Sequence, residues 1–178
     1  MSASTAPASS QSLALQYRHP VYSGDGEVAG FVAVDKMREV QVLLDPQIPE
    51  AAALAELPEG DIVEAELEPL HPGGGPRGRA LYQLRRLRAI SGRRTGSRQR
   101  PALPSRFAGD VLHLNYDRRG SADGVVLESG DFVHLGEQGM NALALKVGDH
   151  VVAEGPARPM RHGGYVLEAE RVNGREVP

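Results

Sequence analysis

Residues 60–66 read GDIVEAE, and residues 148–154 read GDHVVAE. Five of these seven positions are identical, at an offset of 88 residues. In both copies the Gly-Asp pair has turn chemistry, and the apolar residues that follow are spaced as in a half-buried β-strand. A stretch that recurs in this way predicts an internal repeat, so further matches are expected on both sides of it.

Four other blocks match between the two halves, and they occur in the same order along the chain. The matched pairs are Leu15–Tyr17 with Leu114–Tyr116, Val28–Val32 with Ala122–Val126, Val40–Val42 with Val133–Leu135, and Tyr82–Leu84 with Tyr165–Leu167. One such match alone carries little weight, but five in one order favour a tandem duplication. A chain of 178 residues has room for two small domains.

The repeat divides the chain into four predicted parts. The two domains are expected at residues 13–90 and 107–175. Residues 1–12 form an uncharged segment rich in Ala, Ser and Thr, which lacks the basic start and long apolar run of a signal peptide. We expect this segment to be a flexible tail. Residues 91–106 form an arginine-rich linker that also contains Gly, Ser, Thr and Pro.

Each domain is predicted to contain three strands, one short helix and two further strands. In the second domain the strands are expected at residues 112–116, 124–127, 132–135, 150–154 and 165–169, with the helix at 138–147. The helix of the first domain is expected at Pro49–Leu57, because Pro is favourable at the start of a helix. This is the element order of an OB-fold, so the predicted fold is all-β with short helices, as two tandem five-stranded OB-fold-like Greek-key barrels.

One segment of the first domain fits either a helix or a strand. An apolar residue recurs there at every third position, in the series Leu81, Leu84, Leu87 and Ile90. The repeat favours a strand over Tyr82–Arg88. In a regular strand Arg86 and Arg88 would share the inner face with Leu84, so the strand is expected to end early.

Three motifs lie in the second copy: Gly109-Asp110-Val111, Asp123-Gly124-Val125-Val126-Leu127 and Gly148-Asp149-His150-Val151. In this pattern the second copy resembles a group of short bacterial OB-fold modules of largely unassigned function. The first copy matches less well, because it lacks the opening Gly-x-Val and has a longer first loop. The resemblance implies a fold rather than a function. OB-folds commonly bind single-stranded nucleic acid or oligosaccharide on strands two and three and the neighbouring loops, and many serve as protein adaptors.

The net charge of −3 conceals three blocks of alternating sign. Residues 11–68 contain 12 acidic and 3 basic residues, whereas residues 69–109 contain 10 arginines and no acidic residue. Residues 110–178 contain 11 acidic and 7 basic residues. The basic block suits a solvated linker or a contact surface for a polyanion or an acidic partner. The acidic domains would repel a polyanion, and they could instead hold the arginines by intramolecular contacts.

The third strand of the second domain carries the candidate stacking residues. If Val133 and Leu135 face the core, Phe132 and His134 point outward, on the strand that OB-folds use for ligands. An outward Phe beside a His would stack on bases, at about 1–3 kcal/mol per base. The alternative is that Phe132 packs under the basic loop at residues 158–164.

The candidate nucleic-acid-binding residues are Arg86, Arg88, Arg93, Arg94, Arg98, Arg100, Phe132, His134, Arg158 and Arg161. Arginine forks suit this role because they bind a phosphate through two hydrogen bonds. His113 and His134 share outward parity and would be neighbours on adjacent strands. They are expected to be a surface pair rather than a metal site, because no third ligand stands at a recognisable spacing. No catalytic residues and no cofactor are expected, since the chain has neither a nucleophile elbow nor a phosphate-binding loop with Lys.

The sequence therefore predicts a non-enzymatic tandem OB-fold protein that contacts single-stranded or non-specific nucleic acid, DNA or RNA, through the arginine-rich segment and the second domain. The alternative is a protein–protein adaptor that uses the acidic first domain and the basic linker, and a small-ligand or hydrolytic enzyme is a third hypothesis. The aromatic content of 4% favours the adaptor, whereas the arginine density favours nucleic acid. Zero cysteines exclude disulfides and thiolate metal sites but do not choose a compartment, and no apolar run suits a membrane span. A cytoplasmic protein is expected because residues 1–12 lack the features of a signal peptide.

Overall fold

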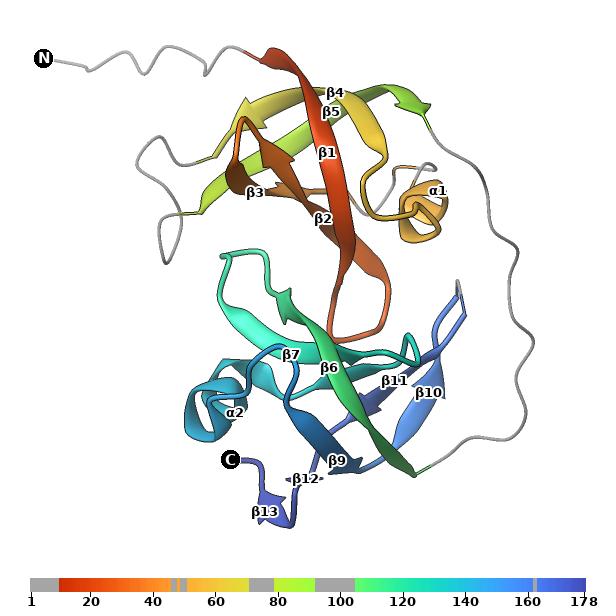
Figure 1. The fold of residues 1–178 in the computed structure, drawn as a ribbon, viewed down its shortest axis with the longest axis vertical. Coiled ribbons are helices and arrows are strands. Elements are labelled where there is room, and N and C mark those ends of the chain that lie inside the picture. The colour runs from red at the N-terminus through yellow and green to blue at the C-terminus, as the bar shows by residue number, and fades with distance from the viewer. Residues whose placement is uncertain (1–9, 46–47, 49–50, 71–78, 92–104, 162) are drawn as a thin grey trace, which may run out of the picture.

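Two β-sheet units follow one another along the chain (Figure 1). The computed structural model describes residues 10–45, 48, 51–70, 79–91, 105–161 and 163–178. The first unit comprises strands β1 to β5 and the second comprises strands β6 to β13, with one short helix in each. The predicted all-β class with short helices is confirmed. Within these ranges, no helix has the length and apolar character needed to cross a membrane.

The first unit is a closed five-stranded barrel with the topology of an OB-fold. Its elements are β1 (Gln11–Tyr22), β2 (Val28–Asp35), β3 (Arg38–Leu43), α1 (Ala51–Ala55), β4 (Ile62–Pro69) and β5 (Ala80–Ser91). The strands pair in the order β1-β2-β3-β5-β4, and β5 closes the barrel by running parallel to β3 and antiparallel to β4. Inward apolar side chains from all five strands fill it, among them Leu15, Phe31, Val42, Val63 and Leu84.

The second unit is a curled open sheet rather than the closed barrel that the repeat predicts. Its elements are β6 (Arg106–Tyr116), β7 (Ala122–Leu127), β8 (Phe132–His134), α2 (Gly136–Leu143), β9 (His150–Glu154), β10 (Ala157–Pro159), β11 (Tyr165–Glu168), β12 (Arg171–Val172) and β13 (Arg175–Glu176). The strand order is β10-β11-β8-β7-β6-β9-β12-β13. As in the first unit, strands one to three form a meander and the third strand pairs in parallel with a later one. The sheet does not close because β8 and β10 occupy both edges of β11, and β9 pairs with β12 instead.

Strand β5 spans the whole segment with the three-residue apolar spacing. The inward residues of β4 alternate regularly, and they face β5 in the pairs Val63 with Ile90, Ala65 with Leu87, and Leu67 with Leu84. Strand β5 has two β-bulges, each of which adds one residue that has no partner on β4. The extra residues are Arg88 and Arg85. The bulges return an apolar residue to the inner face at every third position. The predicted strand is confirmed, but the expectation that it ends early is wrong because the bulges reset the side-chain alternation.

The two units share one pairing register over their first two strands. Tyr17 pairs with Ala33, and Val111 pairs with Leu127. In both strands the register then skips one residue, as a β-bulge does. Tyr22 therefore corresponds to Tyr116, at a constant offset of 94 residues along this stretch.

Three of the five sequence matches are displaced in this register. In the matches that begin at Val28 and at Gly60, the paired residues occupy equivalent positions of the two units. The match that begins at Leu15 is displaced by five residues. The matches that begin at Val40 and at Tyr82 are each displaced by two residues. Val42, for example, corresponds to Val133 rather than to Leu135. A displacement of two preserves the alternation of apolar and polar residues, so the sequence pattern alone does not detect it. The tandem duplication itself stays a prediction.

A close backbone approach occurs at the same register position of each unit. The Cα of Gly30 lies against the backbone carbonyl of Val42, and the Cα of Gly124 lies against that of Val133. Neither position leaves room for a Cβ atom. Glycine is therefore required at both positions for the second and third strands to pair as they do.

Replacing Gly30 by Ala is expected to lower the free energy of unfolding by about 1–3 kcal/mol, because the new Cβ overlaps the Val42 carbonyl. The matched control is Gly109→Ala in β6, whose Cβ would lie 3.7 Å from Leu127. We expect the control to be neutral or stabilising by up to about 1 kcal/mol. Urea denaturation measures both variants, and equal losses of stability would contradict the account.

Candidate functional site

The two units meet along a seam formed by the end of β1, the end of β6 and the loop that follows each strand (Figure 1). The loops are residues 23–27 and 117–121. They share one pattern of backbone hydrogen bonds, in which the first residue donates to the carbonyl of the last and the glycine donates to the carbonyl of the first. The glycine has a positive φ in both loops, 77° at Gly26 and 83° at Gly120. Each loop reaches the opposite unit, so the seam joins the two sheets by equivalent elements.

Asn115 at the end of β6 links the two units through its side chain. Its Oδ1 accepts a hydrogen bond from the backbone N–H of Tyr22 at 2.7 Å, and its Nδ2 donates to the Tyr22 carbonyl at 2.8 Å. The same Nδ2 donates to Asp123 at 2.7 Å. Asn115 is fully buried, so water does not compete for these bonds. Burial also raises the pKa of the Asp123 carboxyl above its usual value, although the Asn115 hydrogen bond opposes the shift.

The loop after β1 covers the outer face of the second unit. Tyr22 stacks on Phe132 with ring centroids 5.7 Å apart, in an apolar cluster with Val126, Met160 and Val166. Gly26 is pressed so closely onto this cluster that a Cβ there would lie 2.9 Å from Met160. The face formed by β7 and β8, which an OB-fold offers to ligands, is therefore occupied by the chain itself.

The expectation that Phe132 is exposed is wrong, because Phe132 has no exposed surface. Its side chain does point away from the main core, as the alternation predicts, but Tyr22 and Met160 cover it. The alternative that places Phe132 under the loop at residues 158–164 is confirmed by the Met160 contact. The buried ring cannot stack on a nucleic-acid base.

The neighbouring predictions for β8 have mixed outcomes. Val133 and Leu135 are buried, as predicted. His134 is only 20% exposed, and its Nδ1 lies 2.8 Å from a carboxylate oxygen of Glu168. His134 and His113 are not on adjacent strands, because β7 lies between β6 and β8. The predicted histidine pair is therefore wrong.

The loop after β6 covers the first unit in the reciprocal way. Gln41 on β3 donates from Nε2 to the Asp117 carbonyl at 2.8 Å, and Arg118 donates to the Leu44 carbonyl at 2.9 Å. The guanidinium of Arg79 lies 4.0 Å from the ring centroid of Tyr116 and donates to its hydroxyl at 3.2 Å. The β3 face of the first unit is thus also engaged by the opposite unit.

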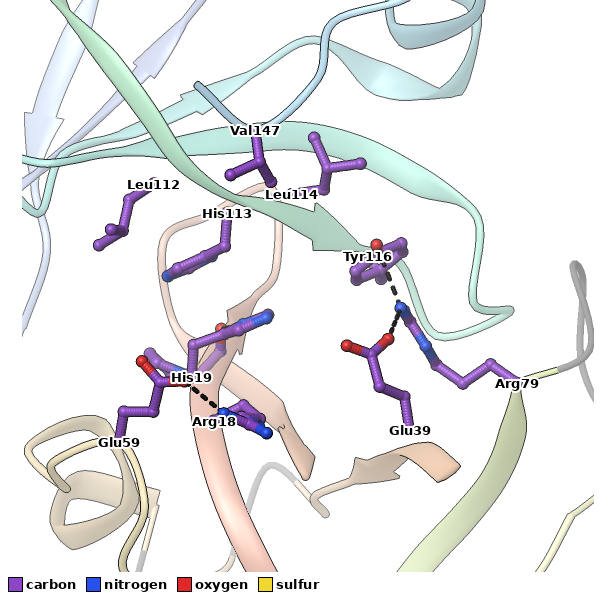
Figure 2. A pocket seen from close by; sticks show the side chains of 11 residues that line it. Arg18, His19, Glu39, Glu59, Arg79, Leu112, His113, Leu114, Tyr116 and Val147 are labelled. Carbon is purple, nitrogen blue, oxygen red and sulfur yellow. Dashed lines mark hydrogen bonds and ion pairs between the residues drawn. The ribbon is translucent and has the colours of Figure 1, made fainter. Parts of the chain in front are cut away.

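A cleft of about 500 Å³ opens along one side of the seam (Figure 2). The rings of His19 and His113 lie at its centre, stacked with centroids 3.8 Å apart and 10° between their planes. The cleft also contains the ion pairs Arg18–Glu59, at 2.7 Å, and Arg79–Glu39, at 2.6 Å. The exposed apolar side chains of Leu112 and Val147 lie at its border.

The cleft is electrically balanced near neutral pH. Burial lowers the pKa of His113 to about 3, and the neighbouring His19 acts in the same direction. Burial likewise lowers the pKa of His19. Both imidazoles are therefore neutral, and each arginine of the cleft is matched by a carboxylate. These groups suit the binding of a side chain or small molecule rather than of a phosphate chain.

Sequence reasoning missed His19 and this cleft. The two histidines are 94 residues apart, which is the offset between equivalent positions of the first two strands in each unit. His19 pairs with Val32, and His113 pairs in the same way with Val126. Among the residues that the structure describes, no cluster of three or more His, Asp or Glu could hold a metal ion.

The predicted arginines fall into three groups. Arg88 is ion-paired with Glu66, and Arg158 binds Asp25 at 3.2 Å and the Gly24 carbonyl at 2.9 Å, so both are engaged within the chain. The side chains without an acidic partner among the described residues are those of Arg86 and Arg161, and both are exposed. The remaining candidates lie outside the described residues: Arg93, Arg94, Arg98 and Arg100.

No family model and no curated protein matches the chain. Among solved structures it is similar to a deletion mutant of the single-stranded DNA-binding protein from Thermus aquaticus. The sequence identity is 16% and the TM-score is 0.28, over 97% of this chain and 95% of that chain.

Replacing Asn115 by Ala is expected to destabilise the seam, because it removes the hydrogen-bond partner of the partly buried N–H and carbonyl of Tyr22. Each unsatisfied group costs about 1–3 kcal/mol. The measurement is the free energy of unfolding, with Asn141→Ala on the exposed surface of α2 as the control, expected within about 0.5 kcal/mol of the parent. An Asn115 variant as stable as the control would show that the seam does not depend on this side chain.

Proposed function

We propose that the chain is a non-enzymatic binding protein that contacts single-stranded DNA or RNA through the arginines of residues 69–109. The observation that carries the proposal is the charge of that block, 10 arginines with no acidic residue. A surface of this kind neutralises phosphates and releases their counterions, which gives binding that depends on salt and not on sequence.

The ion pairs on the outside of the first barrel determine which arginines are available. Arg85 is bonded to Glu68 and Arg88 to Glu66, so these two bulge residues neutralise two of the three glutamates of the neighbouring strand β4. Arg86 lies between them on β5, is exposed and has no acidic partner among the described residues. It is therefore the arginine of β5 that we assign to the nucleic-acid contact, together with the arginines of residues 92–104.

Base stacking on the second unit is not part of the proposal. Phe132 is buried by Tyr22, and Arg158 is bound to the loop after β1. Stacking on aromatic rings is the usual source of tight single-strand binding by OB-folds. Without it, the contact would be mainly electrostatic and would weaken steeply as salt is added.

Replacing Arg93, Arg94, Arg98 and Arg100 together by Ala is expected to leave folding intact and to weaken binding to single strands. The dependence of log K on log salt should flatten by about 0.7 for each phosphate that the protein no longer neutralises. A salt series with labelled single-stranded DNA and RNA measures this slope. An unchanged slope, or no binding to single strands at low salt, would contradict the proposal.

Replacing Arg86 alone by Ala should reduce the same slope by about 0.7, which corresponds to one phosphate. The matched control is Arg171→Ala, which removes the same charge from an exposed arginine on β12 that lies 3.7 Å from Glu176. If the two variants bind equally, the effect of Arg86 is one of net charge and the assigned contact is wrong.

A protein–protein adaptor is the second candidate, and the border of the seam cleft favours it. Leu112 is 52% exposed and Val147 is 63% exposed, and both lie beside the cleft. Exposed apolar side chains around a hollow are typical of a surface that receives a protein side chain. The salt series separates the two candidates, because an adaptor of this kind would not bind single strands even at low salt.

A further inference from the structure

The His19–His113 stack lies at the centre of the seam and takes one ring from each unit. His19 lies on β1 and His113 on β6, each directly after the bulged residue of its strand. The two rings are nearly parallel, at 10°, with centroids 3.8 Å apart (Figure 2). Two neutral imidazoles can stack at this separation, but two imidazolium rings would place like charges in direct contact.

The charged and titratable groups around the stack come from several elements, and they leave little to compensate an imidazolium ion. They are Arg18 on β1, Glu39 on β3, Glu59 before β4, Arg79 before β5 and Tyr116 on β6. Both carboxylates are already bonded to arginines, Glu59 to Arg18 and Glu39 to Arg79. Among the described residues the buried Nδ1 of His113 has no hydrogen-bond partner. The Nδ1 of His19 lies 3.2 Å from the Pro20 carbonyl, but burial outweighs this contact and the two carboxylates and lowers the pKa of His19. The surroundings therefore favour neutral rings.

We propose that the His19–His113 stack is an acid-sensitive clasp, which holds the two units together at neutral pH and releases them when the histidines are protonated. This device is separate from the proposed nucleic-acid contact, because neither histidine belongs to that surface. It acts on the seam as a whole, since the stack, the Asn115 bonds and the Tyr22 cluster join the same two strand ends.

The direction of the pH effect follows from the lowered pKa of both histidines in the closed form. In the open form each ring returns to a pKa of about 6.5. Above that pH both forms are neutral and the clasp is at full strength. As the pH falls below about 6.5, the open form takes up protons that the closed form excludes, and the closing equilibrium weakens. Between pH 7.5 and pH 5 the loss is up to about 30-fold for each histidine.

Opening would uncover apolar surface that the seam hides. Phe132, Met160 and Val166 lose the cover of Tyr22 when the end of β1 moves away. A dye that fluoresces on apolar surfaces should therefore bind as the pH falls, while the far-ultraviolet circular dichroism of the two sheets stays constant. Loss of the circular dichroism signal over the same pH range would indicate unfolding of the sheets and would overturn the clasp.

The direct test is energy transfer between labels placed one in each unit. The chain has no cysteine, so Glu64→Cys on β4 and Glu128→Cys after β7, both exposed, provide unique attachment sites. We expect the transfer efficiency to change between pH 7.5 and pH 5 in the full chain. An efficiency that stays constant over this range overturns the proposal.

A variant with His19→Phe and His113→Phe keeps two stacked rings but cannot take up protons, so its transfer efficiency should not change with pH. The matched control is His150→Gln, because His150 is exposed and lies 2.6 Å from Asp110, away from the seam. The control should keep the pH response of the parent. A response that persists in the double Phe variant, or that disappears in the control, contradicts the clasp.

A second measurement uses the chain without substitutions and does not depend on the folding of any variant. Nuclear magnetic resonance follows the imidazole Cε1 protons of His19 and His113 during a pH titration. We expect both to titrate with a pKa below 6.5, the usual value for His. A pKa at or above 6.5 for both rings would overturn the proposal.

Discussion

The bonds between the Asn115 side chain and the Tyr22 backbone fix how the two sheets sit against each other. The side-chain amide of Asn115 bonds both the N–H and the carbonyl of Tyr22 at the end of β1. A neighbouring strand would make the same two bonds, but here they come from the opposite unit. Because Asn115 is fully buried, water does not replace these bonds while the units are joined. The position of both hairpin loops follows from this link, and so do the histidine stack and the cleft beside it.

This arrangement changes what two OB-fold-like units can do. An isolated OB-fold presents its second and third strands to a ligand, whereas here each of these faces is engaged by the opposite unit, as shown by the Tyr22–Phe132 stack and the Gln41–Asp117 bond. Among the described residues, the cleft at the seam and the outside of the first barrel remain accessible. On the outside of the first barrel, glutamates of β4 hold Arg85 and Arg88 and leave Arg86 available.

The sequence predicts the fold better than it predicts the site. Turn glycines and period-two alternation are local signals, so the all-β class and the order of three strands, one helix and later strands in each unit could be obtained from them. The repeat indicates only residues 82–88 of the strand at residues 80–91, and it does not predict the short strands β10, β12 and β13. The bulges at Arg85 and Arg88 could not be predicted because they depend on the partner strand, and the same holds for the displacement of two residues at Val42. The burial of Phe132 depends on how the units dock, and no local pattern contains that information.

We infer that the two units stay joined through the seam in solution. Hydrogen exchange of the Tyr22 amide, followed by nuclear magnetic resonance at neutral pH, tests it most directly, because that N–H is bonded only to Asn115 across the seam among the described residues. We expect slow exchange, comparable with that of amides inside the first barrel, together with contacts between the rings of His19 and His113. Exchange of the Tyr22 amide as fast as that of a solvated loop, with no contact between the two rings, would contradict it.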